Sequence, residues 1–409
     1  MESTAPPMRL GRVEFTALLA MSMALAALGI DMILPAFGDM RASFGLAEDS
    51  TAVAGTVTAY FFGLAIAQVF YGPLADRFGR KPTLYAGYGI YLLGAVASAL
   101  APSLASLLVA RFIWGLGAAG PRVVTLSVVR DRFDGNEMSR AMSFIMAVFV
   151  LVPILAPTLG AIVASIGSWR WVFGVCALLV VVMALWATRL EESLNPDDRL
   201  ELRFGRVLAA GRMIVTNRLT MGYTMALTAL FGVFTSYLAS SEIIFGEVFG
   251  VVDEFPIMFG VLAAVMGAAM LANAFVVRRF GTRRMAHGVL FVYVAVAVLF
   301  VFVGLSSEGR PSLGVFMPTM AAMLSCHALL IPNFNTIAME PMRPIAGTAS
   351  AVIGTVSTAG GALIGAVLDQ SFNGTILPMA GGFAILGFVA FVLVLWAERG
   401  RLFDRRRPT

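Results

Sequence analysis

The chain consists of long apolar stretches separated by short polar ones. A helix that crosses the hydrocarbon core of a bilayer needs about 20 apolar residues. Twelve stretches reach about this length, and we predict a membrane-spanning helix in each. They cover residues 13–37, 51–72, 83–102, 105–129, 139–164, 169–188, 218–241, 256–278, 285–305, 312–335, 345–369 and 375–397.

The apolar runs are continuous, and this distinguishes between the two structures that can span a bilayer, α-helices and closed β-barrels. Strands of a membrane β-barrel show short alternating segments, whereas helices show unbroken apolar runs. The pattern therefore predicts an all-α membrane protein. Composition agrees, because 59% of the residues are hydrophobic and 13% charged, against about 45–50% and about 25% in soluble proteins. Disorder, nucleic-acid binding and almost any soluble enzyme are excluded.

The longest interior polar stretch divides the twelve spans into six and six. We predict an N-terminal six-helix bundle at 1–188, a cytoplasmic linker at 189–217 and a C-terminal six-helix bundle with a basic cytoplasmic tail at 218–409. The segment Arg77-Phe78-Gly79-Arg80-Lys81 after the second span recurs as Arg279-Phe280-Gly281-Thr282-Arg283 after the eighth. This repeat favours duplication of a six-span unit, as in secondary transporters with a substrate site between two halves. The alternative is that short cytoplasmic loops commonly carry arginine and glycine.

The basic residues predict the orientation of the chain. Arg41, Arg170 and Arg310 fall on one face of the membrane, Arg111 and Arg122 fall inside the fourth span, and the rest of the 29 basic residues fall on the other face. Loops rich in lysine and arginine remain in the cytoplasm. We therefore expect both termini to be cytoplasmic.

Ionisable groups within a span are costly and usually functional. Asp31 in the first span and Arg111 in the fourth each lie about 12 Å from the outer face, at about 1.5 Å per residue. Burial favours a protonated carboxyl group, whereas a nearby arginine favours the ionised form. We hypothesise that Asp31 carries a proton and that Arg111 tunes it; the alternative is a purely structural pair. Asp31 is the one acid placed clearly within a span, because Asp369 is expected to be solvated at the outer end of 345–369.

Arg122 follows Arg111 by eleven residues, which places it on the same helix face about 16 Å farther along the axis. It could line the inner half of a cavity and contact an anionic group of a substrate. Alternatively, its side chain snorkels or braces the inner gate.

The segment 72–82 carries a pattern suited to a gate. Its glycines allow a tight turn, and Asp76 can pair with an arginine or cap a helix. Contacts that exist in one conformation and break in another would open and close a path. The segment closely resembles the signature loop of the major facilitator superfamily, and the gating residues are Gly72, Asp76, Arg77, Gly79, Arg80 and Lys81.

Further motifs resemble the proton-coupled drug antiporters of that superfamily. Arg111 begins a run similar to the fourth-span motif associated with proton coupling, and Asp31-Met32-Ile33-Leu34-Pro35 is similar to a first-span motif. The fifth span contains Pro153, Pro157 and Gly160, a helix-bend motif. Its form, together with Val129-Arg130-Asp131-Arg132-Phe133 and Ser168-Trp169-Arg170-Trp171-Val172-Phe173, resembles the bicyclomycin- and chloramphenicol-resistance branch (Bcr/CflA). We add Arg130 to the gating residues.

The resemblance implies two pseudo-symmetric six-helix bundles in a bacterial inner membrane, transport driven by the proton gradient and no cofactor. Adaptable aromatic walls suit amphipathic ligands. The residues expected to line the substrate cavity are Tyr60, Phe61, Gln68, Arg122, Phe144, Phe149, Phe234, Tyr237, Asn273 and Asn333.

We therefore predict a secondary transporter that exports drugs or other small amphipathic molecules by alternating access. The alternatives are an exporter dedicated to one metabolite or siderophore, and a proton-coupled uptake symporter. We expect no metal site, because the cysteines and histidines lack ligand spacing. We expect no enzymatic activity, because the sequence shows no constellation of nucleophile, base and metal. The expected partners are a small-molecule substrate, protons and lipid, without nucleic acid, and the expected state is a monomer.

Overall fold

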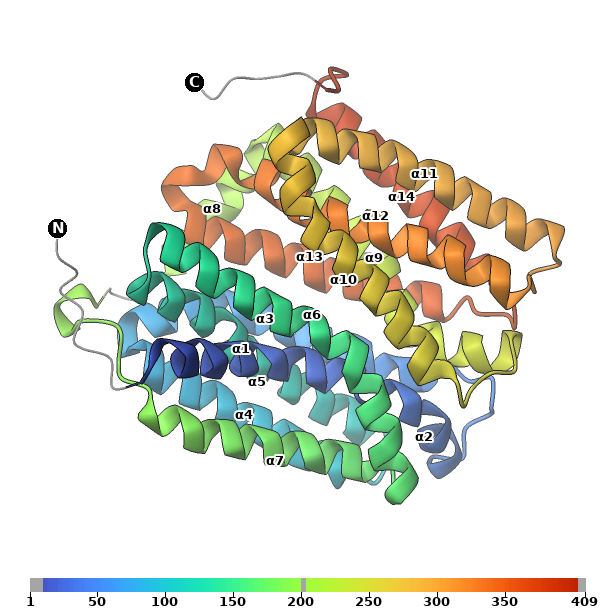
Figure 1. The fold of residues 1–409 in the computed structure, drawn as a ribbon, viewed down its shortest axis with the longest axis horizontal. Helices are drawn as coiled ribbons and strands as arrows, with labels where there is room; N and C mark the ends of the chain where they lie inside the picture. The colour runs from blue at the N-terminus through green and yellow to red at the C-terminus, as the bar shows by residue number, and fades with distance from the viewer. Residues whose placement is uncertain (1–9, 200–203, 404–409) are drawn as a thin grey trace. The chain divides into compact units, whose positions relative to one another are not determined.

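All regular structure in residues 10–199 and 204–403, which the computed structural model describes, is helical (Figure 1). Eleven of the described helical segments are long and apolar enough to cross a membrane. Every predicted span coincides with a helix. The twelve are α1 (Arg12–Asp31), α3 (Gly55–Phe78), α4 (Arg80–Ala99), α5 (Leu104–Arg132), α6 (Gly135–Ile166), α7 (Arg170–Trp186), α9 (Arg218–Ile243), α10 (Phe255–Phe280), α11 (Thr282–Ser306), α12 (Leu313–Met339), α13 (Ala346–Asp369) and α14 (Leu377–Ala397).

The remaining helix, α4, is long enough but is not among these eleven apolar segments, and it carries several tyrosines and glycines. Its tyrosines bond to neighbouring helices. Tyr91 Oη donates to the Leu25 carbonyl of α1 at 2.9 Å, and Tyr85 Oη donates to the Ala184 carbonyl of α7 at 2.8 Å. The low hydropathy of α4 therefore reflects polar groups that are satisfied by protein.

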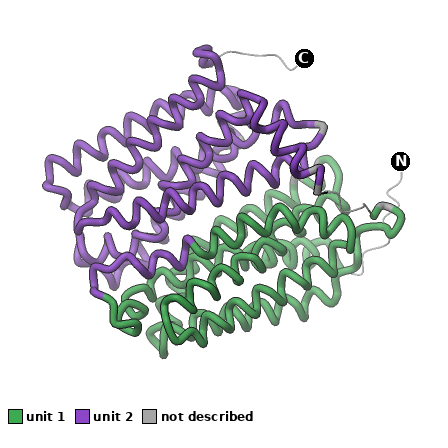
Figure 2. The backbone as a smooth tube through the Cα atoms, turned by 180° about the vertical axis from the view of Figure 1, so that it is seen from behind, with its two compact units in different colours: residues 1–46, 59–204 green, residues 47–58, 205–409 purple. Residues whose placement is uncertain are grey.

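The first compact unit comprises residues 1–46 and 59–204 (Figure 2). In it α1 packs against α5, α6 and α7, and α4 packs against α5 and α7. Small residues let the helix backbones approach closely. A Cβ atom on Gly115 of α5 would lie 2.0 Å from the Tyr60 carbonyl oxygen of α3. α5 thus packs closely against α3 as well as against α1 and α4.

The second unit comprises residues 47–58 and 205–409. Here α9 packs against α12, α13 and α14, and α11 packs against α12 and α14. Counted in span order, these are the same helix pairs as in the first unit. The repeat seen in one short turn therefore extends to the packing scheme of each six-helix set.

Shorter elements complete the chain. α1 is followed by the 3₁₀ turn η1 (Leu34–Ala36) and by α2 (Phe37–Ser43), so that one nearly continuous helical segment runs from Arg12 to Ser43. Within the expected linker lie η4 (Pro196–Asp198) and α8 (Phe204–Thr216). The proposed domain boundaries stay a prediction, and residues 1–9 and 404–409, which contain the termini, lie outside the described residues.

Candidate functional site

The turn between α3 and α4 is a single residue. α3 continues to Phe78 and α4 begins at Arg80, so Gly79 alone makes the connection, with φ +104°. Such a φ favours glycine. The turn is shorter than the expected 72–82 segment, and Asp76 belongs to the last turns of α3. Gly281, with φ +82°, makes the same one-residue connection between α10 and α11.

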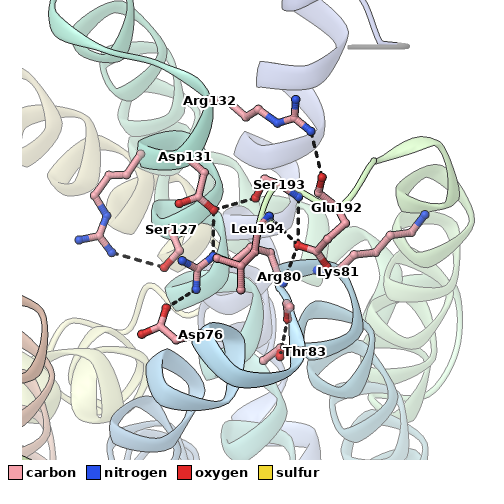
Figure 3. Close-up of polar contacts among 12 residues, drawn as sticks. Asp76, Arg80, Lys81, Thr83, Ser127, Asp131, Arg132, Glu192, Ser193 and Leu194 are labelled. Carbon is pink, nitrogen blue, oxygen red and sulfur yellow. Dashed lines mark hydrogen bonds and ion pairs between the residues drawn. The ribbon is translucent and has the colours of Figure 1, made fainter. Parts of the chain in front are cut away.

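Arg80 joins the ends of three helices (Figure 3). Its guanidinium pairs with Asp76, and its Nε donates to Asp131 Oδ2 at the end of α5 at 2.9 Å. The Arg80 side chain is 10% exposed and that of Asp131 20%, so this ion pair is partly shielded from water and from screening by salt.

Glu192 lies after α7 and covers the start of α4. Its carboxylate accepts the backbone N–H groups of Arg80 and Lys81 at 2.9 and 3.1 Å. The first N–H groups of a helix have no partner within the helix and attract negative charge. Sequence reasoning missed Glu192, because its contacts join residues more than a hundred positions apart. A Cβ on Gly79 would lie 2.5 Å from this carboxylate, so Gly79 provides space as well as conformation.

The remaining predicted gating residues lie around this network. Lys81 Nζ donates to the Thr188 carbonyl at 2.9 Å, and Arg130 Nη2 donates to Ser127 Oγ at 3.4 Å. Arg77 is exposed and Gly72 is partly buried within α3. The structure thus brings Asp76, Arg80 and Lys81 together, with Arg130 bonded along its own helix.

The second unit contains a corresponding arrangement. Arg283, after the eighth span, pairs with Glu340 after the tenth at 2.5 Å and with Glu398 after the twelfth. Glu398 also accepts a hydrogen bond from Tyr223 Oη at 3.0 Å and is buried. In each half, therefore, a basic residue just after the repeated turn binds an acidic residue at or beyond the end of another span.

Asp31 is the last residue of α1 and is 4% exposed. Within residues 10–199 and 204–403 its carboxyl group makes no hydrogen bond or ion pair with another side chain or backbone group. The α6 backbone lies against the adjoining turn, because a Cβ on Gly160 would lie 1.9 Å from the Met32 carbonyl oxygen. Pro153 and Pro157 lie within the continuous helix α6.

Arg111 is completely buried and binds the same end of α1. Its Nη1 donates to the Gly29 carbonyl at 2.7 Å, two residues before Asp31. The guanidinium carbon lies 4.5 Å from the centroid of the Tyr60 ring and 4.8 Å from that of Trp114, distances at which cation and ring attract. The last carbonyls of a helix carry partial negative charge and need partners. Arg111 therefore caps the C-terminal end of α1 beside Asp31.

The expected cavity residues of the first unit differ in exposure. Tyr60 and Phe61 are buried, and Tyr60 Oη donates to the Ala26 carbonyl at 2.8 Å. Gln68 is also buried, Phe144 is 46% exposed, and Phe149 is partly exposed. Arg122 on α5 is partly exposed.

In the second unit each expected cavity residue contacts another side chain. Asn333 Nδ2 donates to Asn273 Oδ1 at 2.8 Å, which joins α12 to α10. The Phe234 ring stacks on His327 at 4.8 Å between centroids, and Tyr237 stacks on Phe259 at 5.7 Å. Their role in binding a substrate stays a prediction.

Comparison with known proteins settles the family. The family model described as Major Facilitator Superfamily matches residues 19–365. The chain belongs to the major facilitator superfamily. A Bacillus subtilis protein named uncharacterized MFS-type transporter YdgK is 27% identical over 93% of this chain and 95% of its own length. A Haemophilus influenzae bicyclomycin resistance protein homolog is 27% identical, covering 86% of this chain and 87% of its own.

Among solved structures, a D-xylose-proton symporter matches with a TM-score of 0.75 at 14% identity, covering 94% of this chain and 97% of its own. At this identity the likeness concerns the fold. The relatives confirm similarity to the bicyclomycin-resistance branch. The chain is thus a multi-pass secondary transporter of the major facilitator fold and not an enzyme. In the described ranges, no group of three or more His, Cys, Asp or Glu side chains could hold a metal ion.

This major facilitator contains a second buried aspartate that sequence reasoning misplaced. Asp369 is 4% exposed and accepts hydrogen bonds from Ser236 Oγ and Ser240 Oγ, each at 2.7 Å. The expectation that it is solvated was wrong. Ser236 and Ser240 are four residues apart and share one face of α9, a spacing that indicates a polar face on this helix but not the partner on α13.

Proposed function

We propose that this major facilitator is a proton-coupled exporter of small amphipathic molecules, with Asp31 as its proton carrier. The observation that supports this most directly is the buried Asp31 carboxyl group, which makes no protein hydrogen bond or ion pair in the described residues. Burial of this kind favours the protonated form, and access to water restores the ionised form. A carboxyl group whose hydration alternates can therefore load and release a proton.

Arg111 has a positioning role in this proposal. It holds the end of α1 through the Gly29 carbonyl, two residues before Asp31. An arginine charge that approaches a carboxyl group favours its ionisation. A shift of α1 against α5 would change the distance between this charge and Asp31. Proton release would then accompany the change of access that carries substrate across the membrane.

The Arg80 network supplies the gate in this scheme. With Asp76 and Asp131 bound to Arg80, and with Glu192 covering α4, the ends of α3, α4 and α5 are held together. Breaking these contacts would release the predicted cytoplasmic end of the bundle. Similarity to a bicyclomycin resistance protein homolog favours export as the direction.

The test is proton-driven transport in proteoliposomes that contain the Asp31→Asn variant. Asparagine has similar size but carries no titratable proton, so substrate-dependent proton movement should fall to the level of empty vesicles. Asp39→Asn is the matched control, because Asp39 lies eight residues along the same helical segment and is exposed. Full proton-coupled transport by correctly inserted Asp31→Asn would overturn the proposal.

Two alternative functions lead to different results in the same vesicles. A dedicated exporter would move one metabolite and leave unrelated drugs untouched. An uptake symporter would accumulate substrate in the direction of the proton gradient. Measuring flux with the gradient imposed in each direction separates them.

A further inference from the structure

Arg122 is a charged residue in a membrane span without a bonding partner in the described part of the chain. It lies on α5, ten residues before Arg132 at the end of the helix, which is about 15 Å along the axis. It is partly exposed and forms no hydrogen bond or ion pair with residues 10–199 or 204–403.

The other arginines of α5 are bonded. Arg111 donates to the Gly29 carbonyl at 2.7 Å, Arg130 to Ser127 Oγ at 3.4 Å, and Arg132 to the Glu192 carbonyl at 3.1 Å. Arginines inside a membrane normally pair with an acid or with backbone carbonyls. Arg122 therefore stands apart from every other arginine on its own helix.

The helix geometry indicates which way Arg122 faces. Eleven residues correspond to three turns and about 20°, so Arg122 shares a face with Arg111, which lies against α1 and α3. The Tyr60 hydroxyl of α3 is within electrostatic range of both arginines. Snorkelling toward lipid head groups does not account for this position, because the side chain is shorter than the remaining length of the helix.

We propose that Arg122 binds an anionic group (a carboxylate, sulfonate or phosphate) on the transported molecule. The proposal rests on the transport function above and narrows its substrate class to amphipathic anions. A guanidinium offers a planar fork of N–H donors that fits such groups in two-point contact. In a region of low dielectric, a bound anion would compensate the arginine charge more effectively than it would in water.

The test compares two dyes that differ only in an anionic group. 8-Anilinonaphthalene-1-sulfonate carries a sulfonate, and N-phenyl-1-naphthylamine has the same rings without it. Fluorescence titration of the protein in phosphatidylcholine nanodiscs, with empty nanodiscs subtracted, gives a Kd for each. We expect the sulfonate dye to bind more tightly, and Arg122→Gln to weaken it by about tenfold or more while changing the neutral dye by less than about twofold.

Two further variants sharpen the comparison. Arg122→Lys keeps the charge but not the fork, so it should retain part of the preference for the sulfonate dye. Arg140→Gln removes an exposed arginine and should leave both affinities unchanged. Equal weakening of both dyes by Arg122→Gln, or wild-type protein without preference for the sulfonate, would overturn the proposal.

Failure of this inference is distinguishable from failure of the transport proposal. Dye binding at equilibrium needs no proton gradient, so Asp31→Asn should keep the sulfonate preference while losing proton-driven flux. If Asp31→Asn retains coupled flux, the proton-carrier proposal fails and the anion preference is decided independently by Arg122→Gln.

Discussion

The side chain of Arg111 caps the C-terminal end of α1. It supplies a charged donor to the Gly29 carbonyl and lies on the rings of Tyr60 and Trp114. A buried carbonyl that loses a charged partner costs about 1.5–3 kcal/mol. Arg111 therefore contributes to stability whether or not it also tunes Asp31.

The replacement Arg111→Met keeps an apolar chain of similar length and removes the donor. We expect the free energy of unfolding to fall by about 2 kcal/mol, seen as a lower thermal midpoint in detergent. Arg111→Lys should recover only part of the loss, because lysine lacks the planar fork and stacks less well. Arg140→Met, at an exposed position, is the control. A midpoint for Arg111→Met equal to that of the control would contradict the capping role.

At the scale of elements, the contact of α6 with the end of α1 depends on one glycine. The space for a Cβ on Gly160 is occupied by the Met32 carbonyl, whereas Gly174 of α7 has nothing within 4 Å of the same position. Of these two helical glycines in the first unit, Gly160 thus has no room for a larger side chain, whereas Gly174 does.

Substituting alanine at these two glycines should change the stability of the protein in opposite directions. Gly160→Ala should push α6 away from α1 and destabilise the protein by about 1–3 kcal/mol. Gly174→Ala should stabilise it by up to about 1 kcal/mol, because alanine favours the helix and meets no clash. Thermal midpoints of the two variants measure this. If both substitutions raise the midpoint, α6 does not need this close approach.

At the scale of the whole molecule, the same plan occurs in both halves. Arg80 and Arg283 each follow a one-residue turn. Arg80 binds Asp76 just before its turn and Asp131 at the end of α5, and Arg283 binds Glu340 and Glu398. Glu192 adds a carboxylate to the start of α4. In each six-helix set, ion pairs and charged hydrogen bonds between distant segments thus connect the helices at one end.

Hydrogen exchange tests whether Glu192 holds the start of α4. In Glu192→Ala the backbone amides of Arg80 and Lys81 lose their acceptor, so they should exchange faster by tenfold or more, which corresponds to about 1.4 kcal/mol. Amides deeper in α4 should keep their protection, because their acceptors lie within the helix. Asp197→Ala, an exposed acid of the same segment, should leave all of them unchanged. Unaltered exchange at Arg80 and Lys81 would show that Glu192 does not hold α4.

The sequence predicted whatever depends on local pattern. Apolar run lengths predicted the twelve helices, and the repeated Phe-Gly step predicted the turns at Gly79 and Gly281. Contacts between distant segments were not predictable, because nothing local links Glu192 to Arg80. Nor was the acceptor of Arg111, since a backbone carbonyl such as that of Gly29 has no signature in the residue types.

The one-residue connection at Gly79 also fixes the rotation of everything that follows it. Each residue of an α-helix turns the chain by about 100°, so inserting one residue into the first turn of α4, directly after this connection, would rotate the rest of the helix by that angle. Tyr85 and Tyr91 would then point away from the carbonyls of Ala184 and Leu25 that they now reach. An insertion at the start of α4 would therefore change which helices its tyrosines can contact. We expect the start of α4 to tolerate substitution far better than insertion.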